Sequence, residues 1–347
     1  MLKFEMRTSP RLVLQVGIIE RFSGMWERLS QSDVMASESA HEIALQRGAE
    51  SCLRLDSTSP AGLSMFIEVQ SNAPELELSG SGERSSNPIS AMLEAHHHPA
   101  GFDLVSICDL WSLIVKGRLT SEQEKLSSLM RHTGIYFTAP EMGPRGDERV
   151  FPAVSPFLVE QRLSELLEWT EHELEEGVFH PLFIIGTFHL LFLQIQPFPT
   201  ANHRLSLVLL WRLLDMHGYG FVRYSHFAPE IEQRSKQYFA SLRQAEKTAY
   251  NNWSTLNIWL EFFLDALVLA SQNLLEKTQR DENTARLTQV QRKIIDVIKS
   301  SGSATREKIV TETGINLSTV KYNLSILANK GHLKRDGGGR STSYRLL

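Results

Sequence analysis

Apolar residues recur at helical spacing over most of the chain from about residue 104 onward. In each such segment the apolar positions lie three and four residues apart, which places them on one face of an α-helix. The segments are 104–117, 157–175, 204–217, 230–246 and 253–273. Pro181–Gln194 is instead apolar on nearly every side. Because it is shorter than the ~20 residues that a membrane span needs, it predicts a buried central helix in a mainly α-helical protein.

The first 78 residues give a weaker pattern. Leu12–Ile19 and Leu63–Val69 fit short strands and helical segments equally well, because periodicity does not separate the two at this length. Ser79–Pro88 is small and polar, and predicts a loop. We therefore expect residues 1–88 to form an N-terminal region that packs on a helical domain over 89–273.

Residues 288–347 predict a separate unit of three short helices followed by a hairpin. It is joined to the rest at 274–287, where the polar segment Glu276–Arg286 fits a linker or a solvated extension of the preceding helix. The second helix covers Thr305–Thr313 and stops at Gly314, and the third covers Asn316–Asn329. A glycine-rich turn then separates two short strands. This order resembles a winged helix-turn-helix, in which the third helix enters the major groove of DNA.

Charge separates the same two parts of the 347-residue chain. From Leu287 to Leu347 there are eleven Lys/Arg and four Asp/Glu, a balance of +7, which leaves −11 for the remainder. A basic tail on an acidic body predicts that any contact with nucleic acid lies in the tail.

Neither the cysteines nor the histidines indicate a metal site. Cys52 and Cys108 lack metal-ligand spacing, which suits a reducing cytoplasm. His96-His97-His98 predicts a solvated loop, because adjacent side chains point in different directions. With no long apolar run at the amino terminus and no span-length segment, we expect a cytoplasmic protein without a membrane partner.

The stretch Ile195–Leu207, I-Q-P-F-P-T-A-N-H-R-L-S-L, carries the most specific pattern of the chain. It resembles the signature H-x-F-x-[D/E]-G-N-G-R-x-x-R of the Fic family, which transfers AMP from Mg-ATP to a hydroxyl group. Phe198, Asn202 and Arg204 match that signature. The departures are Gln196 for the histidine, Thr200 for the acidic residue, Ala201 and His203 for the glycines, and Leu207 for the last arginine.

The segments around this stretch extend the resemblance over residues 104–269. Gly134–Thr138, with Tyr136 and Phe137, resembles the start of the family's target-binding flap, and Trp259–Leu264 resembles its closing helix. The resemblance implies a mainly α fold: a Fic-like helical bundle with a small β flap, followed by the winged-helix (α+β) domain.

Each departure removes something that AMP transfer needs. The amide of Gln196 cannot take a proton from an attacking hydroxyl, and loss of a general base typically costs ~10²–10⁴ in rate. Thr200 offers one neutral oxygen where a carboxylate would hold Mg²⁺. Ala201 and His203 are expected to narrow the backbone cradle for phosphates. We therefore expect no catalytic residue, weakened Mg-ATP binding and no metal site.

The residues that could still hold a nucleotide are Asn202 and Arg204, with Thr200 and His203 beside them. Each has a structural alternative. Asn202 could cap the following helix instead, because asparagine is a preferred N-cap. Arg204 on a helix surface could be solvated or paired within the protein.

In the C-terminal unit, the predicted DNA contacts are polar or basic side chains that can reach bases or phosphates. Those on the outward side of the third helix are Ser318, Thr319, Lys321, Tyr322 and Ser325, and those on the hairpin are Lys334, Arg335, Arg340 and Arg345. A winged helix that serves only dimerisation or protein docking is the alternative.

The sequence thus favours a DNA-binding transcriptional regulator whose Fic-like domain serves as scaffold, dimerisation unit or ligand sensor. A protein target or partner could bind that domain, and a homodimer is plausible because such regulators often read paired half-sites. The alternative is a nucleotide-dependent transferase of the AMPylation type that modifies a protein hydroxyl through a rearranged site, using Arg204, Asn202 and His203.

Overall fold

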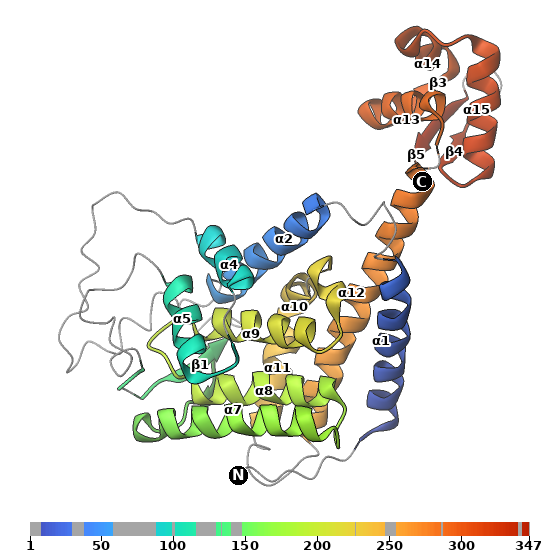
Figure 1. The fold of residues 1–347 in the computed structure, drawn as a ribbon. Helices are drawn as coiled ribbons and strands as arrows, with labels where there is room; N and C mark the ends of the chain where they lie inside the picture. Colours follow the sequence, from blue (N-terminus) through green and yellow to red (C-terminus); the bar gives the residue numbers. More distant parts are fainter. Residues whose placement is uncertain are drawn as a thin grey trace, which may run out of the picture. The chain divides into compact units, whose positions relative to one another are not determined.

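The chain divides into two compact units, Met1–Leu274 and Leu275–Leu347. The computed structural model describes residues 8–29, 38–57, 88–98, 101–115, 130–132, 134–139, 148–225, 227–246, 255–285, 287–338 and 342–346. The first unit is built almost entirely of helices around one core, with a two-stranded antiparallel ribbon at one side (Figure 1).

The elements in the first part of this unit are α1 (Pro10–Leu29), α2 (Glu38–Ser57), α4 (Pro88–His97), α5 (Leu104–Ile114), β1 (Tyr136–Ala139) and β2 (Glu148–Pro152). They are followed by η2 (Pro156–Leu158), α7 (Val159–Glu176), α8 (Pro181–Ile195), α9 (Asn202–Met216) and η3 (Gly220–Arg223). The last are α10 (Ala228–Gln233), α11 (Ser235–Glu246) and α12 (Leu256–Ala285), which continues past Leu274.

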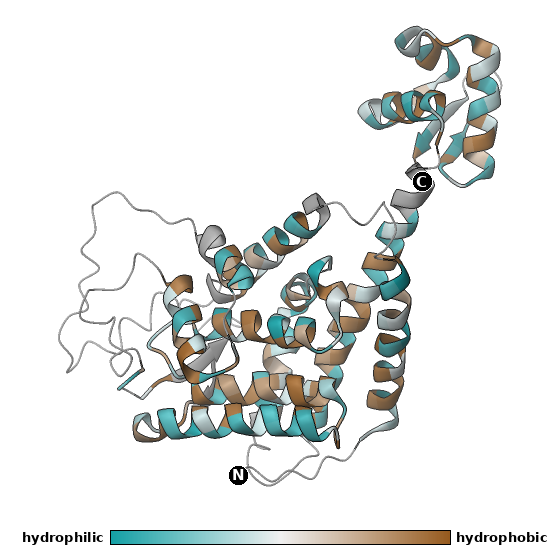
Figure 2. Cartoon of the chain, in the orientation of Figure 1, coloured by the Kyte–Doolittle hydropathy of each residue, from teal (hydrophilic) through white to brown (hydrophobic). Residues whose placement is uncertain are grey.

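Helix α8 is the centre of the first unit, packed between α7 and α9 (Figure 1). Its residues from Leu182 to Ile195 are all buried, and it is drawn mostly in hydrophobic colours (Figure 2). Pro181 stands at its first turn, and the His180 side chain accepts a hydrogen bond from the Leu182 backbone N–H at 3.3 Å. The prediction of a buried central helix is confirmed.

Helix α12 comes very close to α8 at Gly186. The Trp259 indole N–H donates to the Gly186 carbonyl at 2.7 Å, and a Cβ at Gly186 would lie 2.7 Å from Leu260 and 2.8 Å from Phe263. By length and composition alone, Leu256–Gln279 could cross a membrane. The core helix of a soluble protein passes the same test, and Trp259 and Phe263 are fully buried here.

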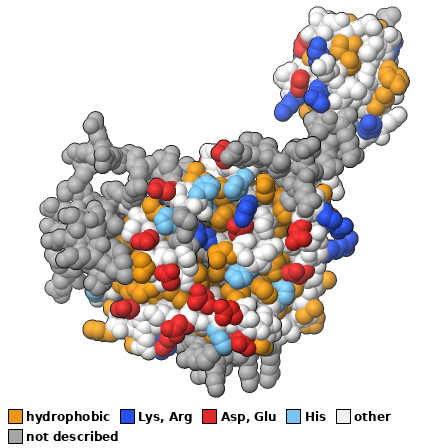
Figure 3. Space-filling view, viewed as in Figure 1, with side chains coloured by type: hydrophobic (Ala, Val, Ile, Leu, Met, Phe, Trp, Pro, Cys, Tyr) orange, Lys and Arg blue, Asp and Glu red, His pale blue; other side chains and the backbone are white. Residues whose placement is uncertain are grey.

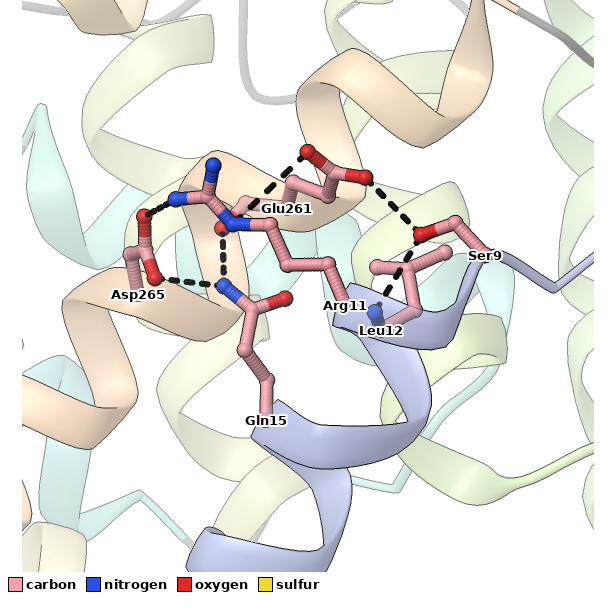
Figure 4. Close-up of polar contacts among 6 residues, drawn as sticks. All are labelled: Ser9, Arg11, Leu12, Gln15, Glu261 and Asp265. Atoms are coloured by element: carbon pink, nitrogen blue, oxygen red, sulfur yellow. Dashed lines mark hydrogen bonds and ion pairs between the residues drawn. The ribbon is translucent and has the colours of Figure 1, made fainter.

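Helix α1 settles the ambiguity of Leu12–Ile19, which lies inside it. Its first turns are bound to α12 by a polar cluster, in which Ser9 donates to Glu261 at 2.9 Å and Arg11 pairs with Asp265 (Figure 4). The Gln15 amide also donates to the Glu261 carbonyl at 2.9 Å.

The second unit contains α13 (Gln289–Ser301), β3 (Ala304–Thr305), α14 (Arg306–Thr313), α15 (Leu317–Asn329), β4 (Leu333–Asp336) and β5 (Ser343–Leu346). The strands form an antiparallel sheet in the order β3-β5-β4, with Leu333 opposite Leu346. The three helices and the hairpin agree with the predicted order, and β3 is an additional short strand. The core of the second unit is apolar and includes Ile294, Ile298, Ile309, Val320, Leu324, Leu327 and Leu333.

The cap at Thr305 and the stop at Gly314 agree with the sequence interpretation, whereas Asn316, predicted inside the third helix, is its N-cap. Thr305 and Asn316 cap α14 and α15 through hydrogen bonds to Lys308 N and Thr319 N. Gly314 ends α14 in the left-handed conformation, with φ at 69°. These local signals fix the turn between the two helices.

Two sequence interpretations are wrong. The segment predicted as a single helix over 230–246 is divided into α10 and α11 at Arg234, whose φ is −116°. His96 does not lie in a solvated loop: it belongs to α4, is 4% exposed, and its ring packs on Trp211 with centroids 4.8 Å apart. Burial lowers the pKa of His96 to about 4.

Two further predictions concern the polar segment at 274–287 and the N-terminal region. Residues 274–285 of the expected polar linker are helical, as the end of α12. Leu63–Val69 and most of Ser79–Pro88 lie outside the described residues.

Candidate functional site

The loop between α8 and α9 has a residue with left-handed backbone at each end. Gln196 ends α8 with φ at 48°, and Ala201 precedes α9 with φ at 61°. Within the described parts of the chain, no other residue besides glycine has a positive φ. Such conformations cost on the order of 1–3 kcal/mol each and persist where surrounding contacts fix them. The loop is therefore held in a costly shape by its neighbours.

Asn202 supplies the first of these contacts. Its Oδ1 accepts a hydrogen bond from the Phe198 backbone N–H at 2.9 Å. Its Nδ2 donates to the Phe198 carbonyl at 2.7 Å and to Gln196 Oε1 at 3.2 Å. Asn202 is 3% exposed and does not cap α9, because Ala201 occupies the N-cap position and gives no side-chain bond. The Asn202 side chain thus bridges Gln196 and Phe198 of the loop.

Gln196 is buried, with 2% of its surface exposed. Its side-chain oxygen accepts from Asn202, and its backbone carbonyl accepts from Arg131 Nε at 2.6 Å. A buried amide of this kind can donate and accept hydrogen bonds but has no proton affinity near neutral pH. The position that resembles the family's catalytic histidine therefore holds no general base.

Arg131 is a residue of the loop's surroundings that the sequence gave no reason to select. Its guanidinium donates hydrogen bonds to the carbonyls of Gln196, Ile195 and Val154. The backbone N–H of Arg131 donates to the Pro197 carbonyl at 3.0 Å. Arg131 is 2% exposed, and burial lowers its pKa to about 10. A cation beside the C-terminal carbonyls of α8 is favoured by the helix dipole. No local spacing could reveal it, since its partners lie far along the chain.

Trp111 of α5 covers the loop on its apolar side. Its ring stacks on Phe198 with centroids 4.8 Å apart and planes 9° from parallel. Its indole N–H donates to the Thr200 carbonyl at 2.8 Å. Thr200 is half-buried, and its backbone rather than its side chain makes this contact. Phe198 is thus a packing residue of the core.

His203 directs its side chain into the protein interior. Its Nε2 lies 2.9 Å from the Tyr238 hydroxyl, and the Nε2 of His189 lies 2.9 Å from the same hydroxyl. Burial lowers the pKa of both histidines to about 3, so both are neutral at pH 7. The backbone of His203 therefore belongs to the first turn of α9, and its side chain belongs to a buried polar network with Tyr238 and His189.

Two further positions of the stretch are buried. Arg204 is 7% exposed, and Leu207 is fully buried. Leu207 supplies no charge, so Arg204 is the one basic side chain, histidine apart, in the stretch Ile195–Leu207.

The β ribbon lies next to this loop. β1 and β2 pair antiparallel, with Tyr136 opposite Pro152 and Phe137 opposite Phe151. The Val154 backbone N–H donates to the Gln194 carbonyl at 3.0 Å, which ties the end of the ribbon to the last turn of α8. The ribbon has the place along the chain expected of the flap.

The predicted DNA-contacting residues of α15 divide into two groups. Ser318, Lys321, Tyr322 and Ser325 are exposed. Thr319 is half-buried, and its carbonyl accepts from the Asn323 side chain at 2.9 Å. The outward face of α15 is thus formed by two serines, a lysine and a tyrosine.

The hairpin residues divide similarly. Lys334 and Arg335 of β4 are exposed. Arg345 of β5 is also exposed but pairs with Asp336 at 2.7 Å. Arg340 lies outside the described residues. Figure 3 shows Asp and Glu side chains spread over the visible face of the first unit, which also carries some Lys and Arg, and shows Lys and Arg with fewer Asp and Glu on the second.

A metal site has no support from the side chains that the structure places. Across these residues, no group of three or more His, Cys, Asp or Glu is arranged to hold a metal ion. Cys52 and Cys108 are both buried as free thiols, and burial raises the pKa of Cys108 to about 11.

Comparison with known proteins shows likeness in structure alone, since no family profile and no curated protein matches the chain. The chain is similar to the crystal structure of a Fic family protein from Desulfovibrio desulfuricans G20, with a TM-score of 0.58 and 17% identity. That match covers 99% of this chain and 98% of the other. A Fic domain containing signaling protein from Bacteroides thetaiotaomicron VPI-5482 matches with a TM-score of 0.48 and 15% identity, over 76% of this chain and 97% of that protein. The first likeness shows that the chain has the fold of a Fic family protein.

Proposed function

We propose that this protein binds duplex DNA through its second unit and acts as a transcriptional regulator. The Fic-like unit serves as scaffold, dimerisation unit or ligand sensor and does not transfer AMP. The protein has no general base at Gln196 and no carboxylate at Thr200, so the chemistry of AMP transfer lacks both its base and its metal ligand.

The exposed face of α15 is the observation that carries the proposal. Val320, Leu324 and Leu327 turn into the core of the unit, while the opposite side presents Ser318, Lys321, Tyr322 and Ser325. Lys334 and Arg335 add exposed positive charge on β4. Hydroxyl and ammonium groups on one helix, with cations on an adjoining hairpin, suit contacts to base edges and phosphates respectively.

Fluorescence anisotropy with a labelled mixed-sequence duplex tests this proposal. We expect Lys334→Ala/Arg335→Ala to weaken binding by about tenfold and to reduce the slope of log K against log salt by about 2, because two phosphate contacts are lost. The matched control is Arg21→Ala/Arg28→Ala, which removes the same charge from exposed positions of α1. Equal effects of both double variants, or no effect of the first, would contradict the proposal.

A second candidate function is binding of a nucleotide at the α8–α9 loop, leading to transfer through a rearranged site. The left-handed conformation of Ala201 favours it, because the backbone keeps a shape that glycine usually provides. The α9 amino terminus also has no side-chain cap, and the positive end of a helix dipole favours an anion.

An assay for transfer of labelled AMP separates the two candidates, and calorimetric titration with Mg-ATP tests whether the α8–α9 loop binds a nucleotide. The first predicts no AMP transfer by the unmodified protein or by Gln196→His, because Thr200 and Leu207 remain. The second predicts saturable heat that is lost in Arg204→Gln, a variant that keeps a polar side chain at this buried position. Transfer of labelled AMP to a protein hydroxyl by the unmodified chain would overturn the first candidate.

A further inference from the structure

The second unit exposes two large apolar side chains among the residues that the structure places there, and both belong to α15. Leu317 is 43% exposed and Tyr322 is 68% exposed. Val320, Leu324 and Leu327 of this helix are buried in the core, and Ile326 is half-buried. The exposed apolar surface of the unit is thus gathered on the helix that presents the polar contact residues.

Helix geometry places Tyr322 away from the core. It follows the buried Val320 by two residues, a rotation of about 200° around the helix axis. Ser318, Tyr322 and Ser325 are spaced by four and three residues, so they form one exposed stripe with the aromatic ring in the middle. Leu317 stands in the first turn of the same helix.

The charges around this stripe favour an anionic partner. α15 contains Lys321 and no Asp or Glu, and Lys330, Lys334 and Arg335 are exposed after it. Asp336, the acidic residue of β4, forms an ion pair with Arg345, whose Nε lies 2.7 Å from its Oδ2. An aromatic ring and a leucine on one helix within a basic surface match the major groove, where phosphates border the bases and the thymine 5-methyl is the apolar group that bases offer.

We propose that Tyr322 and Leu317 read thymine methyl groups, so that the preferred duplex carries A·T pairs opposite these two side chains. This inference rests on the proposed binding of DNA. Tyr322 packs its ring on a methyl group, and its hydroxyl is not required for the contact. Leu317, at the amino end of α15, reaches a second base pair, because residues near the start of such a helix meet base edges.

The experiment begins by selecting duplexes that bind the full-length protein from a random pool. Each thymine of a selected duplex is then replaced by uracil, which removes the methyl group alone. We expect uracil at one or two positions to weaken binding about fourfold, the effect of burying one methyl group. Tyr322→Ala should weaken binding to the thymine duplex similarly and be insensitive to uracil at one of these positions. Tyr322→Phe should bind as the unmodified protein does, and Leu317→Ala should be insensitive to uracil at the other position.

Three outcomes decide the matter. If no duplex is retained from the pool, the proposed function fails and this inference with it. If duplexes are retained but uracil has no effect, DNA binding stands and the reading of thymine is wrong. If Tyr322→Phe binds as weakly as Tyr322→Ala, the hydroxyl contacts a phosphate or base edge instead, which also overturns the inference. Because Tyr322 and Leu317 are exposed, unchanged thermal unfolding of the variants shows that they remain folded.

Discussion

Gln196 and Ala201 hold backbone conformations that glycine would adopt at less cost. Two neighbouring side chains fix this shape: Asn202 binds the loop from within, and Arg131 binds it from outside. The loop therefore keeps a demanding backbone although the side chains expected to perform chemistry are replaced. Strain of this sort is a property of single residues, and single substitutions can measure it.

Ala201→Gly should stabilise the protein slightly. A left-handed alanine costs roughly 1–2 kcal/mol, and glycine adds about 0.5–1 kcal/mol of chain entropy to the unfolded state, so a net gain of up to about 1 kcal/mol is expected. Urea unfolding followed by circular dichroism gives the free energy of unfolding for both proteins. A loss of stability would mean that the alanine methyl makes a packing contact worth more than the strain.

Arg131→Met should destabilise the first unit by about 3 kcal/mol, because several buried carbonyls lose a charged donor. Arg131→Lys keeps the charge but not the planar fork, so it should recover part of this loss. The same urea unfolding checks both variants. A methionine variant as stable as the unmodified protein would show that the guanidinium contributes no net stability.

At the scale of elements, α8 is fixed by its contact with α12. Gly186 allows the two helices to approach, and Trp259 closes the contact with a hydrogen bond to the Gly186 carbonyl. Glycine inside a helix costs about 1 kcal/mol relative to alanine, so the close packing must offset that cost.

Gly186→Ala should therefore lower the free energy of unfolding by about 1–2 kcal/mol, since its new methyl group meets the buried Leu260 and Phe263. Gly24→Ala in α1 is the matched control, because nothing lies within 4 Å of a Cβ there. It should instead stabilise the protein by about 0.5–1 kcal/mol. Thermal unfolding of both variants gives the comparison, and a stabilising Gly186→Ala would refute the close-packing explanation.

The elements that the sequence predicted well are those whose signals are local. Thr305, Gly314 and Asn316 mark the ends of α14 and α15 by rules that need only neighbouring residues. The division at Arg234 and the burial of His96 were missed, because neither glycine nor proline marks the first and α9 buries the second. In the candidate site, Asn202 was expected to contact phosphate or to cap α9, and its side chain instead bonds to the Phe198 backbone. Arg131 bonds to residues more than sixty positions away. Contacts of that separation are decided by packing.

At the scale of the whole molecule, buried histidines couple stability to pH. His189 and His203 share the Tyr238 hydroxyl inside the first unit, and burial lowers the pKa of each to about 3 from an ordinary 6.5. As the pH falls below 6.5, the unfolded chain binds protons that the folded chain does not. The free energy of unfolding should then fall by about 1.4 kcal/mol per pH unit for each histidine, until the pH reaches about 3.

Thermal unfolding measured at pH 7, 5.5 and 4.5 checks this prediction, with progressively lower midpoints expected. Tyr238→Phe provides a second measurement at pH 7. It leaves two buried imidazole nitrogens without their common partner and should cost about 1–3 kcal/mol. A midpoint that does not change between pH 7 and 4.5 would mean that the histidines are solvated in solution.

The buried position of Leu207 bears on how the protein could change over evolutionary time. Gln196→His exchanges one buried polar side chain for another of similar size. An arginine at 207 would place a charge at a fully buried position, and the desolvation of such an ion costs several kcal/mol. Of these two substitutions, each of which would make the loop more similar to the Fic signature, the second is opposed by burial of the position. Packing of the core thus disfavours a second arginine in this stretch.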